Sequence, residues 1–163
     1  MKKYLLPLFC MIWLAGTSCE TKINTEKEKK AIMEVLYKEA EAIKAGDLDG
    51  LFALHTQDSL ETRIELGIYG YNTIKGWDNV KALLRDAVQG LQHPYAVNTK
   101  ENVIIKVAGN SAWLTCDNIW TWNLDGDSQG YSNIQVVFFE KIKGEWKISF
   151  ASYYSKAIPV GNN

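Results

Sequence analysis

The order of the sequence patterns constrains the fold of this chain more than any single motif does. The last third contains three strand-like runs that end in Gly144-Glu145-Trp146-Lys147-Ile148, whereas helical spacing dominates the first half. Helices first and an antiparallel meander last is the order typical of α+β proteins. About 140 residues remain after an N-terminal signal, which is ample for one domain and short for two. We therefore expect a single α+β domain.

The amino-terminal residues predict export. Met1-Lys2-Lys3 is positively charged, and residues 4–15 form an apolar run that is too short to span a bilayer as a helix. We interpret residues 1–18 as a signal peptide. The following Gly16-Thr17-Ser18-Cys19 resembles a bacterial lipoprotein cleavage box, although Leu is usual where Gly16 stands. The resemblance implies acyl chains on Cys19 and a place in the bacterial cell envelope; ordinary cleavage without lipid is the alternative.

Composition limits the possible partners and cross-links. Residues 19–29 are predicted to be a solvated tether, because residues 20–30 contain a single apolar side chain, Ile23. The predicted domain covers residues 30–158, and a tail covers residues 159–163. The mature domain keeps only Cys116 as a free thiol, so no intramolecular disulfide is expected. Removing Lys2 and Lys3 from the 18 basic residues leaves 16 against 19 acidic ones, a formal charge of −3. This balance predicts no nucleic-acid partner.

Apolar spacing predicts three helices. The first begins near Thr25, which has capping-box spacing to Glu28, the second follows Ala45-Gly46-Asp47, and the third follows Gly76-Trp77-Asp78. The apolar positions expected to face the core are Met33, Leu36, Ala40 and Ile43 in the first helix, Leu48, Leu51 and Phe52 in the second, and Val80, Leu83, Leu84, Ala87 and Val88 in the third.

His55 falls on the apolar face of the second predicted helix. A histidine in such a place is more often a core residue bonded to a backbone group than a catalytic base, and both interpretations stay open. The other histidine, His93, precedes Pro94 in a predicted loop. No second ligand is spaced to form a metal site with either histidine, so we expect no metal and no cofactor.

Residues 59–66 show a period of two. Leu60, Thr62, Ile64 and Leu66 are assigned to the buried face, and the charged Glu61, Arg63 and Glu65 to the wet face. The charged face is explained by simple alternation on a half-exposed strand. The alternative is a pair of catalytic carboxylates with an arginine between them.

Aromatic and amide residues gather on the later strands. Trp120 and Trp122 share one face with Asn118 and could line a pocket that stacks on a flat apolar ligand, or they could be sheet core or dimer interface. On the strand after residue 130 both faces are largely apolar, which favours a central or interfacial position.

Four motifs occur in a characteristic order: Ala45-Gly46-Asp47-Leu48-Asp49-Gly50-Leu51, Gly76-Trp77-Asp78-Asn79-Val80, Asn110-Ser111-Ala112 and Gly144-Glu145-Trp146-Lys147-Ile148. Together they resemble the nuclear transport factor 2-like superfamily, in its polyketide-cyclase-like (SnoaL-like) branch, over about residues 30–156. The resemblance implies an α+β fold with a cone-shaped, strongly curved mixed β-sheet wrapped around a long N-terminal helix, three helices in all, and an internal pocket. It also implies a homodimer formed through the sheet.

Two functions follow from this resemblance and from the residues. The first is an exported, lipid-anchored domain that binds a small, partly apolar molecule and needs no cofactor. The second is an isomerase- or dehydratase-like enzyme with a proton-transfer group inside the cone. A dimerising interaction module is a third possibility. Relatives often carry a carboxylate where Thr62 stands and histidine near Ser152, Tyr153 and Tyr154, and both departures weaken the enzyme interpretation. The candidate ligand-binding residues are Asn118, Trp120, Asn133, Gln135 and Tyr154, and the candidate catalytic residues are Tyr37, His55 and Asp117.

Overall fold

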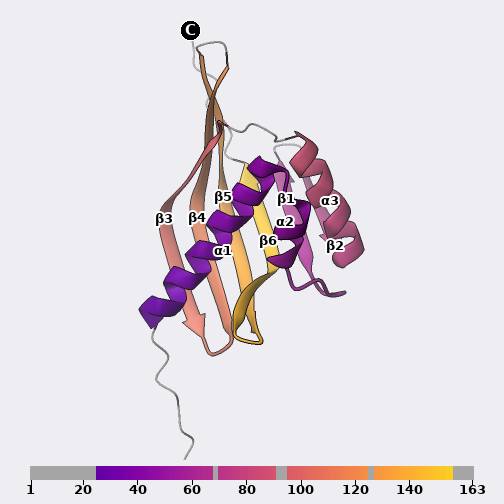
Figure 1. The fold of residues 1–163 in the computed structure, drawn as a ribbon, viewed down its shortest axis with the longest axis vertical. Coiled ribbons are helices and arrows are strands. Elements are labelled where there is room, and N and C mark those ends of the chain that lie inside the picture. Colours follow the sequence, from indigo (N-terminus) through magenta and orange to yellow (C-terminus); the bar gives the residue numbers. More distant parts are fainter. Residues whose placement is uncertain (1–24, 68–69, 91–94, 125–126, 156–163) are drawn as a thin grey trace, which may run out of the picture.

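The computed structural model describes residues 25–67, 70–90, 95–124 and 127–155. The predicted signal peptide and Cys19 lie outside these ranges. The described part is α+β with three helices, as the sequence predicts, and it contains six strands (Figure 1). The helices are α1 (Thr25–Ala45), α2 (Leu48–Ala53) and α3 (Trp77–Gly90); the strands are β1 (Thr62–Gly67), β2 (Gly70–Lys75), β3 (Val97–Ala108), β4 (Ser111–Leu124), β5 (Asp127–Ile142) and β6 (Glu145–Ser155). None of the described helices is long and apolar enough to cross a membrane.

The strands form one mixed sheet in the order β2-β1-β6-β5-β4-β3. β1 runs parallel to β6, and every other neighbouring pair is antiparallel. The sheet curves around α1, and α3 lies beyond α1 on the β1–β2 side (Figure 1). The sheet does not close, because β2 and β3 remain at its two edges. The predicted curved mixed sheet around a long first helix is confirmed.

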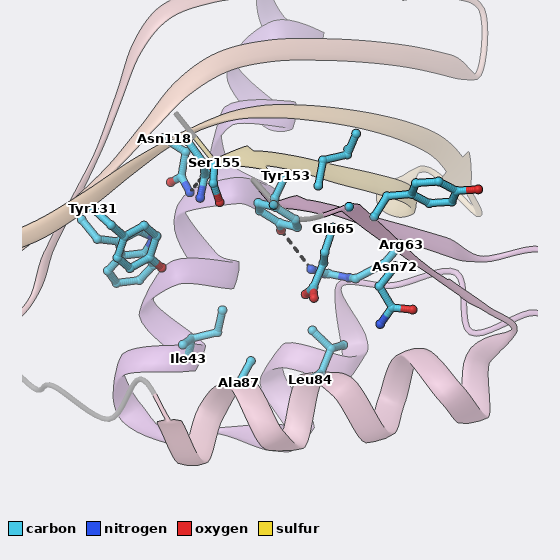
Figure 2. A pocket seen from close by; sticks show the side chains of 16 residues that line it. Ile43, Arg63, Glu65, Asn72, Leu84, Ala87, Asn118, Tyr131, Tyr153 and Ser155 are labelled. Carbon is cyan, nitrogen blue, oxygen red and sulfur yellow. Dashed lines mark hydrogen bonds between the residues drawn. The ribbon is translucent and has the colours of Figure 1, made fainter. Parts of the chain in front are cut away.

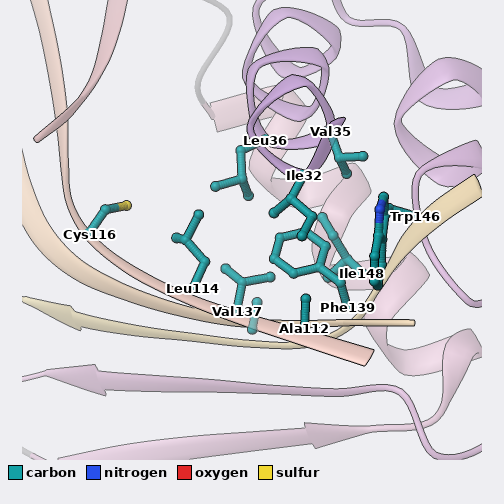
Figure 3. Packing of buried hydrophobic residues seen from close by; sticks show 11 residues of the cluster. Ile32, Val35, Leu36, Ala112, Leu114, Cys116, Val137, Phe139, Trp146 and Ile148 are labelled. Carbon is teal, nitrogen blue, oxygen red and sulfur yellow. The ribbon is translucent and has the colours of Figure 1, made fainter. Parts of the chain in front are cut away.

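The main core lies between α1 and the inner face of the sheet. Ile32, Val35 and Leu36 recur at helical spacing and point down onto the strands (Figure 3). They meet apolar side chains that alternate along β4, β5 and β6: Ala112, Leu114, Cys116, Val137, Phe139, Trp146, Ile148 and Ala151. Period-two alternation places these residues on one face of the sheet, and on β6 a bulge between Ile148 and Phe150 shifts the alternation so that Ala151 shares the face of Ile148. The packed region therefore fills one end of the space under the sheet.

A second core packs the three helices together. It consists of Ala42, Ile43, Leu51, Phe52, Val80, Leu84 and Val88. The chain turns sharply between α1 and α2 at Gly46, whose φ of +71° suits glycine, and Asp47 caps α2 by accepting a hydrogen bond from the Gly50 amide at 2.9 Å. The predicted glycine stop and aspartate start are both present. This second core packs α3 on α1 and α2, and Ile74 of β2 packs against it, so α3 also contacts the β1–β2 side of the sheet.

The face assignment of β1 is wrong. The period of two is correct, but Glu61 and Arg63 are 1% and 5% exposed, whereas Leu60 is 84% exposed. Thr62, predicted to point inward, lies on the opposite side of the strand. The physical reason is that the inner end of β1 faces other charged residues, which compensate Glu61 and Arg63, so that hydrophobicity alone assigns the wrong side.

Candidate functional site

A cavity of about 640 Å³ lies between the inner face of the sheet and the α1–α3 layer (Figure 2). Its helical wall is apolar and consists of Ile43 from α1 with Leu84 and Ala87 from α3. The opposite wall comes from the sheet and is largely polar. The sheet residues that line it are Arg63, Glu65, Leu66, Gly67, Gly70, Tyr71, Asn72, Asn118, Trp120, Tyr131, Asn133, Tyr153 and Ser155. A ligand in this space would contact an apolar wall on one side and hydrogen-bonding groups on the other.

Arg63 and Tyr153 form one corner of the cavity. Arg63 Nη1 donates to the Tyr153 hydroxyl at 2.9 Å, and the guanidinium carbon lies 5.5 Å from the centre of the tyrosine ring (Figure 2). Gln135 Nε2 donates to the same hydroxyl at 3.2 Å. Burial raises the pKa of Tyr153, so the phenol keeps its proton.

Behind this corner lies a buried ionic cluster. Arg63 Nη2 donates to Glu39 Oε1 on α1 at 2.6 Å, and it also lies 3.4 Å from His55 Nε2. His55 Nδ1 lies 2.6 Å from Glu61 Oε1, and the other carboxylate oxygen of Glu61 accepts the Gln57 backbone N–H at 3.0 Å. Burial has the largest single effect and would raise the pKa of Glu39, but the charge and hydrogen bond of Arg63, with smaller contributions from His55 and Lys100, together outweigh it, and the pKa is lowered. The carboxylate of Glu39 therefore stays ionised and balances Arg63.

A row of hydrogen-bonded cross-strand neighbours supports the polar wall; of its members, Asn118 and Asn133 line the cavity. Lys100 on β3 pairs with Asn118 on β4, and Asn118 pairs with Asn133 on β5. Lys100 Nζ donates to Asn118 Oδ1 at 2.6 Å, and Asn118 Nδ2 donates to Asn133 Oδ1 at 3.1 Å. Lys100 also donates to Gln135 Oε1 at 3.1 Å, which links this row to Tyr153. Burial lowers the pKa of Lys100.

A family model described as the SnoaL-like domain matches residues 32–154 of the chain. This chain belongs to the SnoaL-like domain family. Among curated proteins, none matches. The match covers the helices that pack on the sheet and nearly all of the described strands.

Solved structures of the same fold accompany the family match. An NTF2-like protein with a cystatin-like fold from Novosphingobium aromaticivorans is 16% identical with a TM-score of 0.65, over 80% of this chain and 83% of that one. The association domain of CaMKII from C. elegans is 18% identical with a TM-score of 0.66, over 80% and 97%. A proposed dehydratase of the NTF2-like family from Streptomyces avermitilis is 13% identical with a TM-score of 0.66, over 82% and 99%. At these identities the likeness shows the fold alone.

Three of the predicted ligand-binding residues line the cavity of this SnoaL-like domain, namely Asn118, Trp120 and Asn133. Gln135 is buried behind the wall and reaches the cavity only through its hydrogen bond to Tyr153. Tyr154 is 54% exposed and is not among the described lining residues. Since neighbouring residues of a strand face opposite sides, Tyr153 takes the inward position that the sequence interpretation assigned to Tyr154.

The three candidate catalytic residues are not brought together. His55 is buried and bonded to the Glu61 carboxylate, and it does not belong to the described cavity lining. Tyr37 is 44% exposed on the outer side of α1, beside Met33 and Lys38. Asp117 lies on the outer face of β4, where its Oδ2 accepts a hydrogen bond from Asn102 Nδ2 at 2.6 Å. The geometry thus separates these residues from one another and from the cavity.

The sequence interpretation missed Glu39, Lys100 and Tyr153. Glu39 carried a signal, because it lies at the helical spacing of the buried Val35 and Ile43 and is an acid on an apolar stripe. Lys100 and Tyr153 had none, because their partners depend on strand pairing. Within the described ranges, no group of three or more His, Cys, Asp or Glu side chains is arranged to hold a metal ion.

The ion pair between Glu39 and Arg63 predicts a large effect of removing one charge. We expect Glu39→Gln to lower the free energy of unfolding by about 3–5 kcal/mol, because Arg63 would remain buried without its counter-charge. The advantage of the wild type is present above the unfolded-state pKa of about 4.3 and is lost as the pH falls toward the lowered pKa of Glu39. Urea unfolding between pH 7 and pH 3 measures both effects.

Glu41→Gln on the exposed side of the same helix is the matched control, with an expected change within about 0.5 kcal/mol. Similar losses in the two variants would contradict a buried ion pair that stabilises the site.

Proposed function

We propose that this domain binds a small, partly apolar molecule in the cavity under the sheet. The observation that carries the proposal is the cavity itself, which has a volume of about 640 Å³. In it, Ile43, Leu84 and Ala87 form an apolar wall opposite a polar one. Small-molecule sites in proteins are concave, mostly apolar and of roughly 300–1,000 Å³, with a few placed polar groups. This cavity has both the size and the division between apolar and polar walls.

The polar wall is held in place before any ligand arrives. Asn118 accepts hydrogen bonds from Asn98 Nδ2 at 2.8 Å and from Lys100, and its own amide donates to Asn133. Side chains fixed in this way lose little conformational entropy when a ligand binds. The rigidity of the wall therefore supports a binding role.

The geometry supports an isomerase- or dehydratase-type enzyme less well. His55 does not reach the described cavity lining, and Asp117 lies on the other face of the sheet. Glu65 is the carboxylate among the described lining residues, and its side chain is exposed, whereas a proton-transfer group is expected inside the cone. One fold neighbour is a proposed dehydratase and another an association domain, so the fold itself does not choose between these roles.

Filling the cavity tests the binding proposal. Ala87→Phe extends a ring from α3 into the space that a ligand would occupy, and we expect it to abolish retention of any co-purified molecule. Native mass spectrometry of protein purified from its source measures this retention. Ala82→Phe makes the same change at an exposed position of the same helix and is expected to keep the molecule. Equal retention by Ala87→Phe and the wild type would contradict binding in this cavity.

We further propose that two copies associate through the outer face of the sheet. Ile134, Phe138 and Tyr154 expose large apolar or aromatic groups on this face, which α1 leaves uncovered because it packs on the other side. Phe138 also packs edge to face on Phe150 at a centroid distance of 5.5 Å, which gives the face a rigid aromatic centre. One fold neighbour is itself an association domain.

A charge placed on this face should dissociate the dimer. We expect Phe138→Lys to raise the dimer dissociation constant at least about tenfold, since a buried apolar contact is lost and a charge must be desolvated. Analytical ultracentrifugation measures the constant, with Gln89→Lys on the exposed side of α3 as the control. A monomeric wild-type protein at micromolar concentration would contradict the proposal.

The proposed location of the domain is the bacterial cell envelope, where acyl chains on Cys19 would tether it to a membrane surface. Met1-Lys2-Lys3, the apolar residues 4–15 and the box that ends at Cys19 support this proposal. Cys19→Ala in the full chain is expected to move the protein from the membrane fraction to the soluble fraction and to remove the mass of the acyl chains. An unmodified Cys19 in the intact mass of the wild-type protein would refute the anchor.

A further inference from the structure

We propose that one end of the domain is a docking surface for an anionic phospholipid bilayer, and that docking turns the cavity away from the membrane. The proposal rests on the membrane anchor proposed for Cys19 and names the surface with which the domain meets the lipid. We call this surface the basic end. It consists of residues 25–38 of α1, residues 106–113 around the β3–β4 turn and residues 140–147 around the β5–β6 turn.

Three segments that are distant in the sequence meet at the basic end. Lys141 Nζ and Trp146 Nε1 both donate to Glu28 Oε2 on α1, each at 2.7 Å. The Lys141 backbone N–H donates to the carbonyl oxygen of Asn110 in the β3–β4 turn, also at 2.7 Å. Figure 1 shows the start of α1 and both turns at the same end of the domain. These contacts fix the three segments as one surface.

The basic end differs in charge from the rest of the domain. It carries eight lysines and five glutamates, a formal charge of +3. The other described residues carry six basic and twelve acidic side chains, a formal charge of −6. The lysines of the basic end are Lys27, Lys29, Lys30, Lys38, Lys106, Lys141, Lys143 and Lys147, and its glutamates are Glu26, Glu28, Glu34, Glu140 and Glu145. An anionic surface therefore attracts this end and repels the remainder.

The excess positive charge of the basic end is exposed. Four of its lysines are each matched by a glutamate, at N–O distances of 2.7–2.9 Å. Lys30, Lys106 and Lys143 are exposed and form no salt bridge within the described ranges, and the same holds for the acidic Glu140. The balance is positive, and the ammonium groups are free to approach phosphate headgroups. Clusters of lysine next to a membrane anchor are attracted to anionic lipids in this way.

The chain leaves the domain at this end, toward the proposed anchor. α1 begins at Thr25, and Cys19 precedes it by six residues, which span at most about 20 Å. Acyl chains on Cys19 would keep the basic end within that distance of the headgroups. The Debye length is about 8 Å at physiological salt, so exposed lysines act on a charged surface only at close range. A short tether supplies this proximity, and a few lysines then suffice to orient the domain.

The cavity lies at the opposite end of the same elements. Its lining includes Ile43 near the end of α1, Gly67 at the end of β1 and Ser155 at the end of β6, whereas the basic end contains the start of α1 and the start of β6. α1 has 21 residues, so its two ends are about 30 Å apart. With the basic end on the bilayer, the cavity faces away from the membrane, and its ligand arrives from the aqueous phase.

Vesicle binding by the unanchored protein tests the docking surface apart from the lipid anchor. The protein is Cys19→Ala without the signal peptide, and the vesicles contain equal parts of phosphatidylglycerol and phosphatidylcholine. We expect its partition coefficient, measured by co-sedimentation, to be at least about tenfold higher than on pure phosphatidylcholine, and to fall to that lower level at about 0.5 M salt. Lysine acetylation read by mass spectrometry is expected to show that the anionic vesicles protect Lys30 and Lys143 but not Lys75 on β2.

Charge reversal separates the basic end from net charge. Lys30→Glu together with Lys143→Glu is expected to lower the partition coefficient on the anionic vesicles at least about tenfold. Lys75→Glu together with Arg85→Glu changes the net charge by the same amount at exposed positions of β2 and α3. This control is expected to lower the coefficient by less than about threefold, because salt screens charges that lie far from the bilayer. Circular dichroism reports whether each variant is folded.

The outcomes distinguish the parts of the proposal. Equal partitioning on the two kinds of vesicle would overturn the docking surface and leave the cavity and anchor proposals standing. Equal losses in the two charge-reversed proteins would overturn its placement at the basic end, and protection of Lys75 together with Lys30 would overturn the orientation of the cavity. Binding to heparin as tight as binding to the anionic vesicles would overturn the choice of a lipid partner. The mass of Cys19 tests the anchor separately, so its failure is distinguishable from a failure of docking.

Discussion

The buried ion pair between Glu39 and Arg63 is the interaction on which the site depends. It joins α1 to β1 at an N–O distance of 2.6 Å, at a depth where an unpaired charge would be strongly destabilising. Arg63 in turn holds the hydroxyl of Tyr153 on β6. One side chain thus connects the long helix, a strand from the first half of the chain and the last strand. Without the counter-charge of Glu39, Arg63 could not remain beside the cavity.

The mixed sheet is what allows these contacts to form. β1 pairs in parallel with β6, although the two strands are far apart in the sequence. Their register places Glu65 opposite Tyr153 and Arg63 opposite Ala151. The antiparallel pairing of β3, β4 and β5 aligns Lys100, Asn118 and Asn133 in one row, as direct cross-strand neighbours. Side chains in such positions lie close enough to interact. The register of the sheet therefore converts polar residues from five strands into one hydrogen-bonded wall.

The interior under the sheet has a packed end and a hollow end, because different helices cover the two ends. Where α1 presents Ile32, Val35 and Leu36, they pack against the buried apolar residues of β4, β5 and β6. Toward the other end, Val80, Leu84 and Val88 of α3 pack with side chains of α1 and α2, and Leu84 and Ala87 line the cavity opposite the polar residues of the sheet. The polar wall cannot collapse onto these apolar residues without losing its hydrogen bonds. An open cavity between them is the result.

The sequence by itself determined the α+β class, the three helices, the turn at Gly46-Asp47 and the period of two along residues 59–66, because propensity, capping and alternation act between residues close in the chain. It also offered Asn118, Trp120 and Asn133 as candidate ligand-binding residues but left open which faces of the strands line the cavity. Only the tertiary structure decided that Glu61 and Arg63 point inward and that Tyr153, rather than Tyr154, lines the cavity. A buried charge is stable only beside its partner, and the partners of Arg63 lie 24 and 90 residues away in the sequence. No local pattern can report that proximity.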